Sequence, residues 1–193
     1  MVQEVVLAAF LFVVAISITP GPNNIMLASS GASFGIAKTI PHIFGISSGV
    51  LAMFSASAFG VNALYEAFPN QIIILKVIGS VYVIYLASRI WKLKKIGEES
   101  AEKPIGFFEA FTFQFLNPKA WVMVLNISAL YISMLGYEAL ALILFLTNLV
   151  CISVWAVFGF LIRNSLLRSQ KRLILFNRSM AVLLAFCIPF VFF

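Results

Sequence analysis

Long apolar runs, separated by short segments that hold most of the charge, extend along the whole chain. A helix needs about 20 residues to cross a bilayer core, and six runs are long enough: 5–33, 39–64, 71–91, 107–134, 138–162 and 173–193. They lack the alternation of a membrane β-barrel, and helices satisfy their own backbone groups, as lipid requires. The pattern predicts an all-α integral membrane protein with six transmembrane helices in a single domain, residues 1–193.

The composition supports this prediction. Only 10% of the residues are charged and 62% are hydrophobic, whereas a soluble domain has about 25% charged residues. The net charge of +6 lies in short segments between the runs rather than in a basic patch, so no nucleic-acid partner is expected. The first residues carry no basic region, which predicts a retained first span rather than a signal peptide. Cys151 and Cys187 lie within apolar runs without metal-ligand or disulfide spacing, so packing roles are favoured and no metal or cofactor is expected.

The basic residues predict the orientation. Lys38 follows the first run, and two further groups follow the third and fifth: Arg89, Lys92, Lys94, Lys95 and Lys103, then Arg163, Arg168, Lys171, Arg172 and Arg178. With six spans, all three connections lie on one side, which the positive-inside rule makes cytoplasmic. The opposite connections, 65–70 and 135–137, contain no Lys or Arg. Both termini are therefore predicted to be extracytoplasmic, with a cytoplasmic linker over about 92–106.

Small residues share one face of the second run, at Gly45, Gly49, Ala52, Ala56 and Gly60. Their spacings of three and four allow another helix to approach closely. Packing within the chain is the simpler interpretation, and a homodimer contact is the alternative.

Two runs are interrupted by residues that a regular helix does not tolerate. The first contains Thr19-Pro20-Gly21-Pro22-Asn23-Asn24, and the fourth contains Asn117-Pro118-Lys119. Helical rise places Pro22 and Pro118 roughly 16 Å from the cytoplasmic edge, near the middle of a core about 30 Å thick. Two interrupted spans, each opening a set of three, point to a transporter built from inverted repeats, here residues 1–95 and 104–193.

The chemistry of the breaks favours an anionic or zwitterionic ligand. Each proline starts a half-helix whose N-terminal amides and partial positive charge face the membrane centre, and Lys119 adds a full charge. Amide and hydroxyl side chains can bind further polar groups, so a small α-amino acid fits. The candidate substrate site comprises Thr19, Pro20, Gly21, Pro22, Asn23, Asn24, Asn117, Pro118 and Lys119. The alternative is that the prolines only kink the helices and Lys119 snorkels to the interface, which is difficult over roughly 16 Å.

Two titratable residues are candidates for proton coupling. His42 is the only histidine and its side-chain type titrates near neutral pH, although a polar boundary residue is the simpler interpretation. Glu109 either titrates during transport or stabilises the N-terminus of its helix, and the second role is favoured.

These motifs together resemble the LysE/RhtB family of amino-acid exporters. The resemblance rests on Thr19-Pro20-Gly21-Pro22-Asn23 with Gly31, Gly35, Gly45 and Gly49, on the segment 79–86, and on Asn117-Pro118-Lys119-Ala120. It covers essentially the whole chain. Pro22-Asn23-Asn24-Ile25 and Phe113-Gln114-Phe115 are similar to the cysteine and O-acetylserine exporter branch. The resemblance implies export of a small amino acid across the cytoplasmic membrane of a bacterium, driven by the proton gradient.

Two other classes of protein fit the sequence less well. A membrane-embedded enzyme is disfavoured, because the chain has no Asp, one His and no Ser or Cys with an evident base. A passive channel remains an alternative, since broken helices also line pores.

Overall fold

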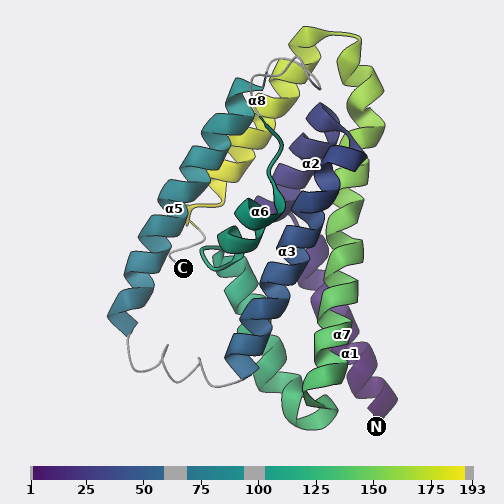
Figure 1. The fold of residues 1–193 in the computed structure, drawn as a ribbon, viewed down its shortest axis with the longest axis vertical. Helices are drawn as coiled ribbons and strands as arrows, with labels where there is room; N and C mark the ends of the chain where they lie inside the picture. The colour runs from purple at the N-terminus through teal and green to yellow at the C-terminus, as the bar shows by residue number, and fades with distance from the viewer. Residues whose placement is uncertain (1, 59–68, 94–102, 190–193) are drawn as a thin grey trace.

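The computed structural model describes residues 2–58, 69–93 and 103–189, and of residues 69–76 it describes the backbone alone. These parts of the chain contain helices and no strand, so the all-α prediction is confirmed (Figure 1). The helices are α1 Val2–Ile18, α2 Pro22–Phe34, α3 Ile36–Ala56, α5 Pro69–Lys92, α6 Phe107–Gln114, α7 Pro118–Leu167 and α8 Gln170–Phe186.

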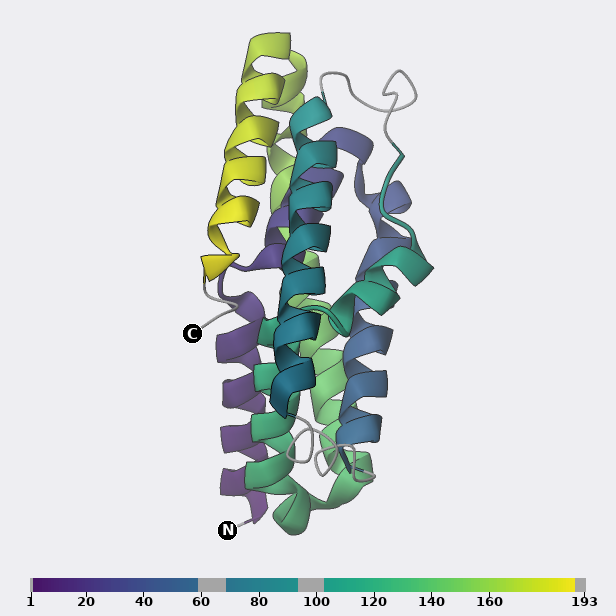
Figure 2. The ribbon, with the colours of Figure 1, turned by 90° about the vertical axis from the view of Figure 1, so that its left-hand side faces the viewer.

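The helices run back and forth between the two ends of an elongated bundle. In Figures 1 and 2, α1 and α2 lead upward from the N-terminus, α3 returns to the lower end, and α5 leads up again. Helix α6 and the first part of α7 lead downward, the rest of α7 ascends the full height, and α8 descends beside α5. This order of directions agrees with the predicted topology, while the count of six membrane spans stays a prediction.

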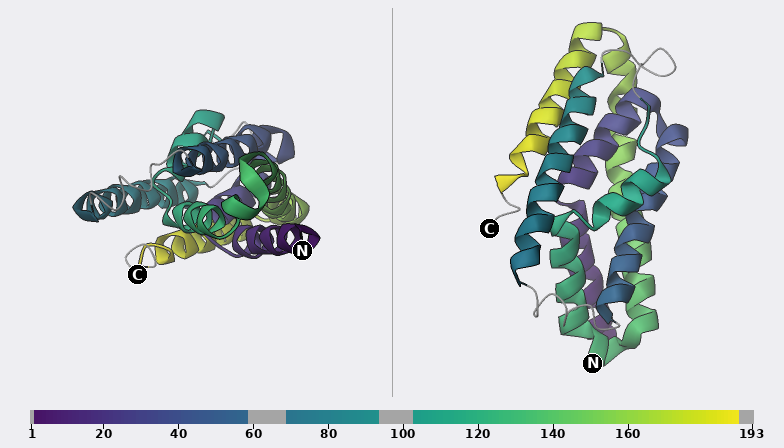
Figure 3. Two further views of the ribbon diagram at one scale, coloured as in Figure 1. Left: turned by 90° about the horizontal axis from the view of Figure 1, so that it is seen from below. Right: turned by 60° about the vertical axis from the view of Figure 1, so that its left-hand side comes forward.

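Helix α7 reverses direction at Gly136, whose backbone has φ 75° and ψ 169°. A positive φ is readily adopted by glycine because it has no side chain. The turn lies at the lower end next to the N-terminus (Figure 3). The prediction of a short connection at 135–137 is thus confirmed, and α7 consists of two antiparallel arms, 118–135 and 137–167.

The predicted basic connections are wrong in extent. Lys38 lies in α3, and Arg89 and Lys92 lie in the last turn of α5. Helix α7 continues to Leu167 and α8 begins at Gln170, so Arg163, Lys171 and Arg172 lie in helices rather than in a loop. Arg178 likewise lies within α8. Arg and Lys are good helix formers, so both helices continue beyond the apolar runs that the sequence marks.

By length and hydropathy, α3 and α7 are long and apolar enough to cross a membrane. Helices α1 and α2 meet that test as a pair, bent by 61° at the break between them. The interruption predicted in the first run is therefore confirmed. The interruption predicted in the fourth run is confirmed too, since α6 ends at Gln114 and α7 begins at Pro118.

Glycines set the closest helix contacts. A β-carbon at Gly45 or Gly49 would lie 2.3 Å or 2.7 Å from the backbone oxygen of Phe107 or Phe111 in α6. The small-residue face of α3 thus packs within the chain, as the simpler interpretation held, and its last predicted member, Gly60, lies outside the described residues.

Candidate functional site

The first break separates α1 from α2 at residues 19–21. Gly21 is the N-cap of α2 in extended conformation, and no side chain caps this N-terminus. The carbonyls at the end of α1 accept from side chains, one nearby in α2 and one in the distant α7. Asn24 donates from Nδ2 to the carbonyls of Ser17 at 2.8 Å and Thr19 at 2.7 Å, and Trp155 Nε1 donates to Ile18 O at 3.0 Å.

Lys119 reaches from the second break into the first. Its Nζ donates to Thr19 O at 2.6 Å, to Thr19 Oγ1 at 2.9 Å and to Pro20 O at 3.4 Å. The lysine lies against Gly21, where an added β-carbon would be 3.0 Å from Cδ and 3.1 Å from Nζ. Lys119 therefore does not snorkel to an interface; it joins the two interrupted helices.

The second break is satisfied by its own segment. A tight turn follows α6, with bonds from Leu116 N to Phe113 O and from Asn117 N to Gln114 O, both 3.0 Å. Asn117 caps α7, because its Oδ1 accepts from Lys119 N at 3.2 Å and its carbonyl accepts from Ala120 N at 3.1 Å. These local bonds leave α7 with a closed N-terminus.

An amide pair also connects the two broken helices. Asn23 Nδ2 donates to Gln114 Oε1 at 2.8 Å, and Gln114 Nε2 donates back to Asn23 Oδ1 at 3.1 Å. Gln114 is fully buried and also donates to Ala110 O at 2.8 Å. The sequence pointed to Asn23 but gave Gln114 no role in the site.

A buried polar cluster beside the first break was not predicted. Asn148 of α7 donates to Ser17 Oγ at 3.1 Å and accepts from Ser47 Oγ of α3 at 3.3 Å. Ser17 also donates to Met123 Sδ at 3.5 Å. The one sequence signal for this cluster was a lone asparagine within a strongly apolar run.

Two cavities border the breaks. The smaller has a volume of about 30 Å³, is lined in part by Asn23, Asn24 and Asn148, and has room for little more than a water molecule. The larger has a volume of about 280 Å³ and is lined by Pro20, Gly21, Pro22, Gly79, Val83, Leu116, Asn117, Pro118, Lys119, Val122 and Cys187. It lies just below the range of pockets for drug-sized ligands, which suits a smaller molecule.

The structure therefore brings the predicted site residues together. Eight of the nine line one or both cavities, and Thr19 contacts the lysine that lines both. Gly21, Pro22, Asn117 and Lys119 border both cavities and separate them.

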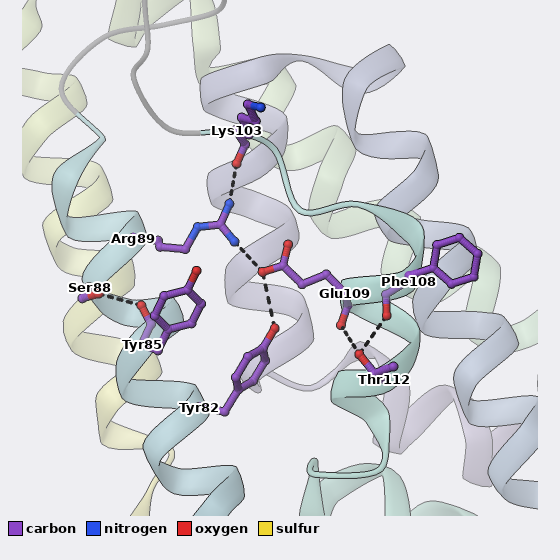
Figure 4. Close-up of polar contacts among 8 residues, drawn as sticks. All are labelled: Tyr82, Tyr85, Ser88, Arg89, Lys103, Phe108, Glu109 and Thr112. Atoms are coloured by element: carbon purple, nitrogen blue, oxygen red, sulfur yellow. Dashed lines mark hydrogen bonds and ion pairs between the residues drawn. The ribbon is translucent and has the colours of Figure 1, made fainter.

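The two proton-coupling candidates lie away from these cavities. Glu109 is in the first turn of α6, as predicted, where it pairs with Arg89 Nη1 and accepts from Tyr82 Oη at 3.4 Å (Figure 4). Arg89 Nη2 also donates to Lys103 O at 2.7 Å. His42 is completely buried in α3, and neither ring nitrogen has a hydrogen-bond partner among the residues described. No cluster of three metal-ligating side chains occurs within the described ranges.

Two interrupted helices whose breaks border one cavity are typical of membrane transporters. The sequence matches the LysE type translocator model over residues 14–192, and the chain belongs to this family. It is thus a transporter and not an enzyme.

Relatives cover nearly the whole chain. A Salmonella typhimurium protein named cysteine/O-acetylserine efflux protein is 28% identical over 187 residues, 92% of each chain. Proteins with the same name from Klebsiella pneumoniae and Shigella flexneri are each 28% identical, over 94% and 98% of each chain. No solved structure matches this chain.

Proposed function

We propose that this protein is a secondary transporter that exports small amino acids or their derivatives, of the cysteine and O-acetylserine kind, across the inner membrane of a bacterium. The relatives named above and the family support the substrate class. The observation that carries the proposal is the contact of Lys119 with the first break, beside a cavity of about 280 Å³.

The substrate carboxylate binds at the N-terminus of α2. That terminus has no side-chain cap, so its first amides and partial positive charge are available to an anion. Lys119 Nζ lies next to the N-cap Gly21 and supplies a full positive charge. A carboxylate at this position contacts both the first amides of α2 and Lys119 Nζ.

Six spans in two inverted halves give the transport path. Helices α1 and α2 ascend while α6 and the first arm of α7 descend, so the broken helices run in opposite directions (Figure 1). The low density of basic residues at the lower end, where the N-terminus lies, supports extracytoplasmic termini.

Export is driven by the proton gradient, with His42 and Glu109 as the groups that carry protons. The side-chain type of His42, which titrates near neutral pH, supports this role. Its buried ring nitrogens have no hydrogen-bond partner among the described residues, so protonation requires a rearrangement that brings the charge a contact. Glu109 supports it through its pair with Arg89, which links α5 to the start of the second broken helix.

Exchange in proteoliposomes tests the proposal. Vesicles preloaded with unlabelled cysteine or O-acetylserine receive labelled solute outside, and an amino-acid panel ranks the substrates. We expect accelerated, saturable uptake that an imposed pH gradient modulates. Uptake that never saturates supports the passive channel instead, and folded protein without any uptake removes the amino-acid assignment.

A further inference from the structure

The C-terminal end of α1 gathers three oxygen acceptors around one nitrogen. The acceptors are the carbonyls of Thr19 and Pro20 and the hydroxyl of Thr19, which we call the α1 carbonyl cradle. An ammonium group has three donors and no acceptor, and the end of a helix adds partial negative charge. The cradle thus has the features of an ammonium site, and the ammonium of Lys119 occupies it.

The occupant comes from another element. Lys119 lies 100 residues from Thr19, in the first turn of α7. Pro20 and Lys119 both line the larger cavity, so a ligand in that cavity lies beside the cradle. An external ammonium group can enter the cradle only when Lys119 leaves it.

We propose that the cradle binds the α-ammonium group of the substrate and that Lys119 holds the place of this group until the substrate arrives. The inference rests on the proposed amino-acid export and extends it to the second charge of the zwitterion. The substrate ammonium replaces Lys119 Nζ at Thr19 and Pro20, and the displaced lysine pairs with the substrate carboxylate at the N-terminus of α2.

This exchange predicts that the substrate must carry both charges. An amine without a carboxylate offers Lys119 no new partner, so the lysine stays in place. A carboxylate without an amine draws Lys119 away, which leaves Pro20 O without this donor and Thr19 O with Asn24 Nδ2 alone. The zwitterion supplies a replacement donor and is therefore bound better. Only the zwitterion satisfies both ends of the break.

Chemical rescue of a lysine variant tests the cradle without any transport assay. Purified Lys119→Met is melted in methylammonium chloride or in equal tetramethylammonium chloride, which has no N–H donor. We expect methylammonium alone to raise the Tm of the variant, by about 2–4 °C at a few times its Kd. Wild type, whose cradle is filled, and Lys171→Met, from the exposed start of α8, should show no difference between the salts.

An equal Tm of Lys119→Met in the two salts would contradict the proposal that the cradle binds an ammonium group. If this variant does not fold, Lys119→Gln carries the same comparison, because its uncharged side chain is one atom shorter and leaves room for methylammonium.

Transport then separates the cradle from the proposed function. Cysteamine, which is cysteine without its carboxylate, should not inhibit cysteine exchange by wild type. Thr19→Val should raise the KM for cysteine about fivefold, the value of one hydrogen bond. Thr112→Val is the matched control, because the Thr112 hydroxyl bonds only backbone carbonyls of its own helix. If the wild type exchanges amino acids normally but methylammonium does not stabilise Lys119→Met, the cradle is rejected and the exporter proposal stands. If methylammonium stabilises Lys119→Met but the wild type exchanges no amino acid, the exporter proposal is rejected and the ammonium site stands.

Discussion

The two helix breaks look equivalent in the sequence and differ in the structure. At the second, Asn117 caps α7 and a tight turn uses the carbonyls at the end of α6. At the first, α2 has no side-chain cap, and Lys119 and Trp155 supply donors to α1 from α7. Local bonds alone close the second break, while the first combines the local donor Asn24 with two donors from the distant α7, Lys119 and Trp155. We propose the substrate site at the first break because the N-terminus of α2 there has no side-chain cap.

The largest expected effect of a single substitution is that of Lys119→Ala. It removes the charge from the first break, takes the Lys119 donor from Pro20 O and Thr19 Oγ1, and leaves Thr19 O with Asn24 Nδ2 as its donor. A hydrogen bond to a charged group contributes about 1.5–3 kcal/mol, so exchange should fall by about 10- to 150-fold. Membrane insertion, measured by fractionation, should remain. Normal exchange by the purified variant would remove Lys119 from the site.

Gly21→Ala tests the first break by a steric change that leaves every charge in place. The new β-carbon would lie 3.0 Å from Lys119 Cδ and 3.1 Å from Nζ, so the lysine must shift. We expect the KM for exchange to rise about tenfold, which corresponds to about 1.4 kcal/mol. Gly106→Ala is the control, since Gly106 is also an extended N-cap and has open space around its β-carbon position. Equal effects of the two changes would refute this steric account.

Asn117→Ala removes the cap that distinguishes the second break. Loss of an N-cap costs about 1 kcal/mol, so the Tm should fall by about 2–4 °C. Exchange should fall only a few-fold, because the lysine contact to the first break does not need this side chain. A loss of exchange as deep as that of Lys119→Ala, with an unchanged Tm, would show that the two breaks bind substrate equally.

The smallest effects concern the two indoles that bond near the breaks. Trp155 Nε1 donates to Ile18 O at 3.0 Å, and Trp121 Nε1 donates to Phe115 O at 2.9 Å. Trp155→Phe removes a distant donor from the open break and should raise the KM two- to fivefold, the effect of roughly one hydrogen bond. Trp121→Phe should leave the KM within error. A larger rise in KM for Trp121→Phe than for Trp155→Phe would contradict the proposed difference between the two breaks.

The breaks were predictable because proline acts locally. Pro22 and Pro118 cannot continue a regular helix wherever they occur, so Gly21 and Asn117 could be placed at helix N-termini from the sequence. The turn at Gly136 was also predictable, since a short segment without basic residues separates two apolar runs.

The partners across the breaks were not predictable. Lys119 contacts Thr19 across 100 residues, and Gln114 pairs with Asn23 across 91. Such pairs depend on how the helices pack, and a single sequence carries no periodic signal for them. Asn148 was missed for the same reason, because one polar residue in an apolar run does not show which helix it faces.

The contact between α2 and the second arm of α7 has a mechanical consequence. A β-carbon at Gly31 would lie 2.1 Å from Ala156 O, and one at Gly159 would lie 2.0 Å from Ala28 O, so the two backbones touch directly at two levels. Packed interfaces of this kind do not deform gradually. Helix α2 and this arm should therefore move as one rigid unit, with residues 19–21 as the hinge. A conformational change at one side of the membrane would then reach the other side through the break.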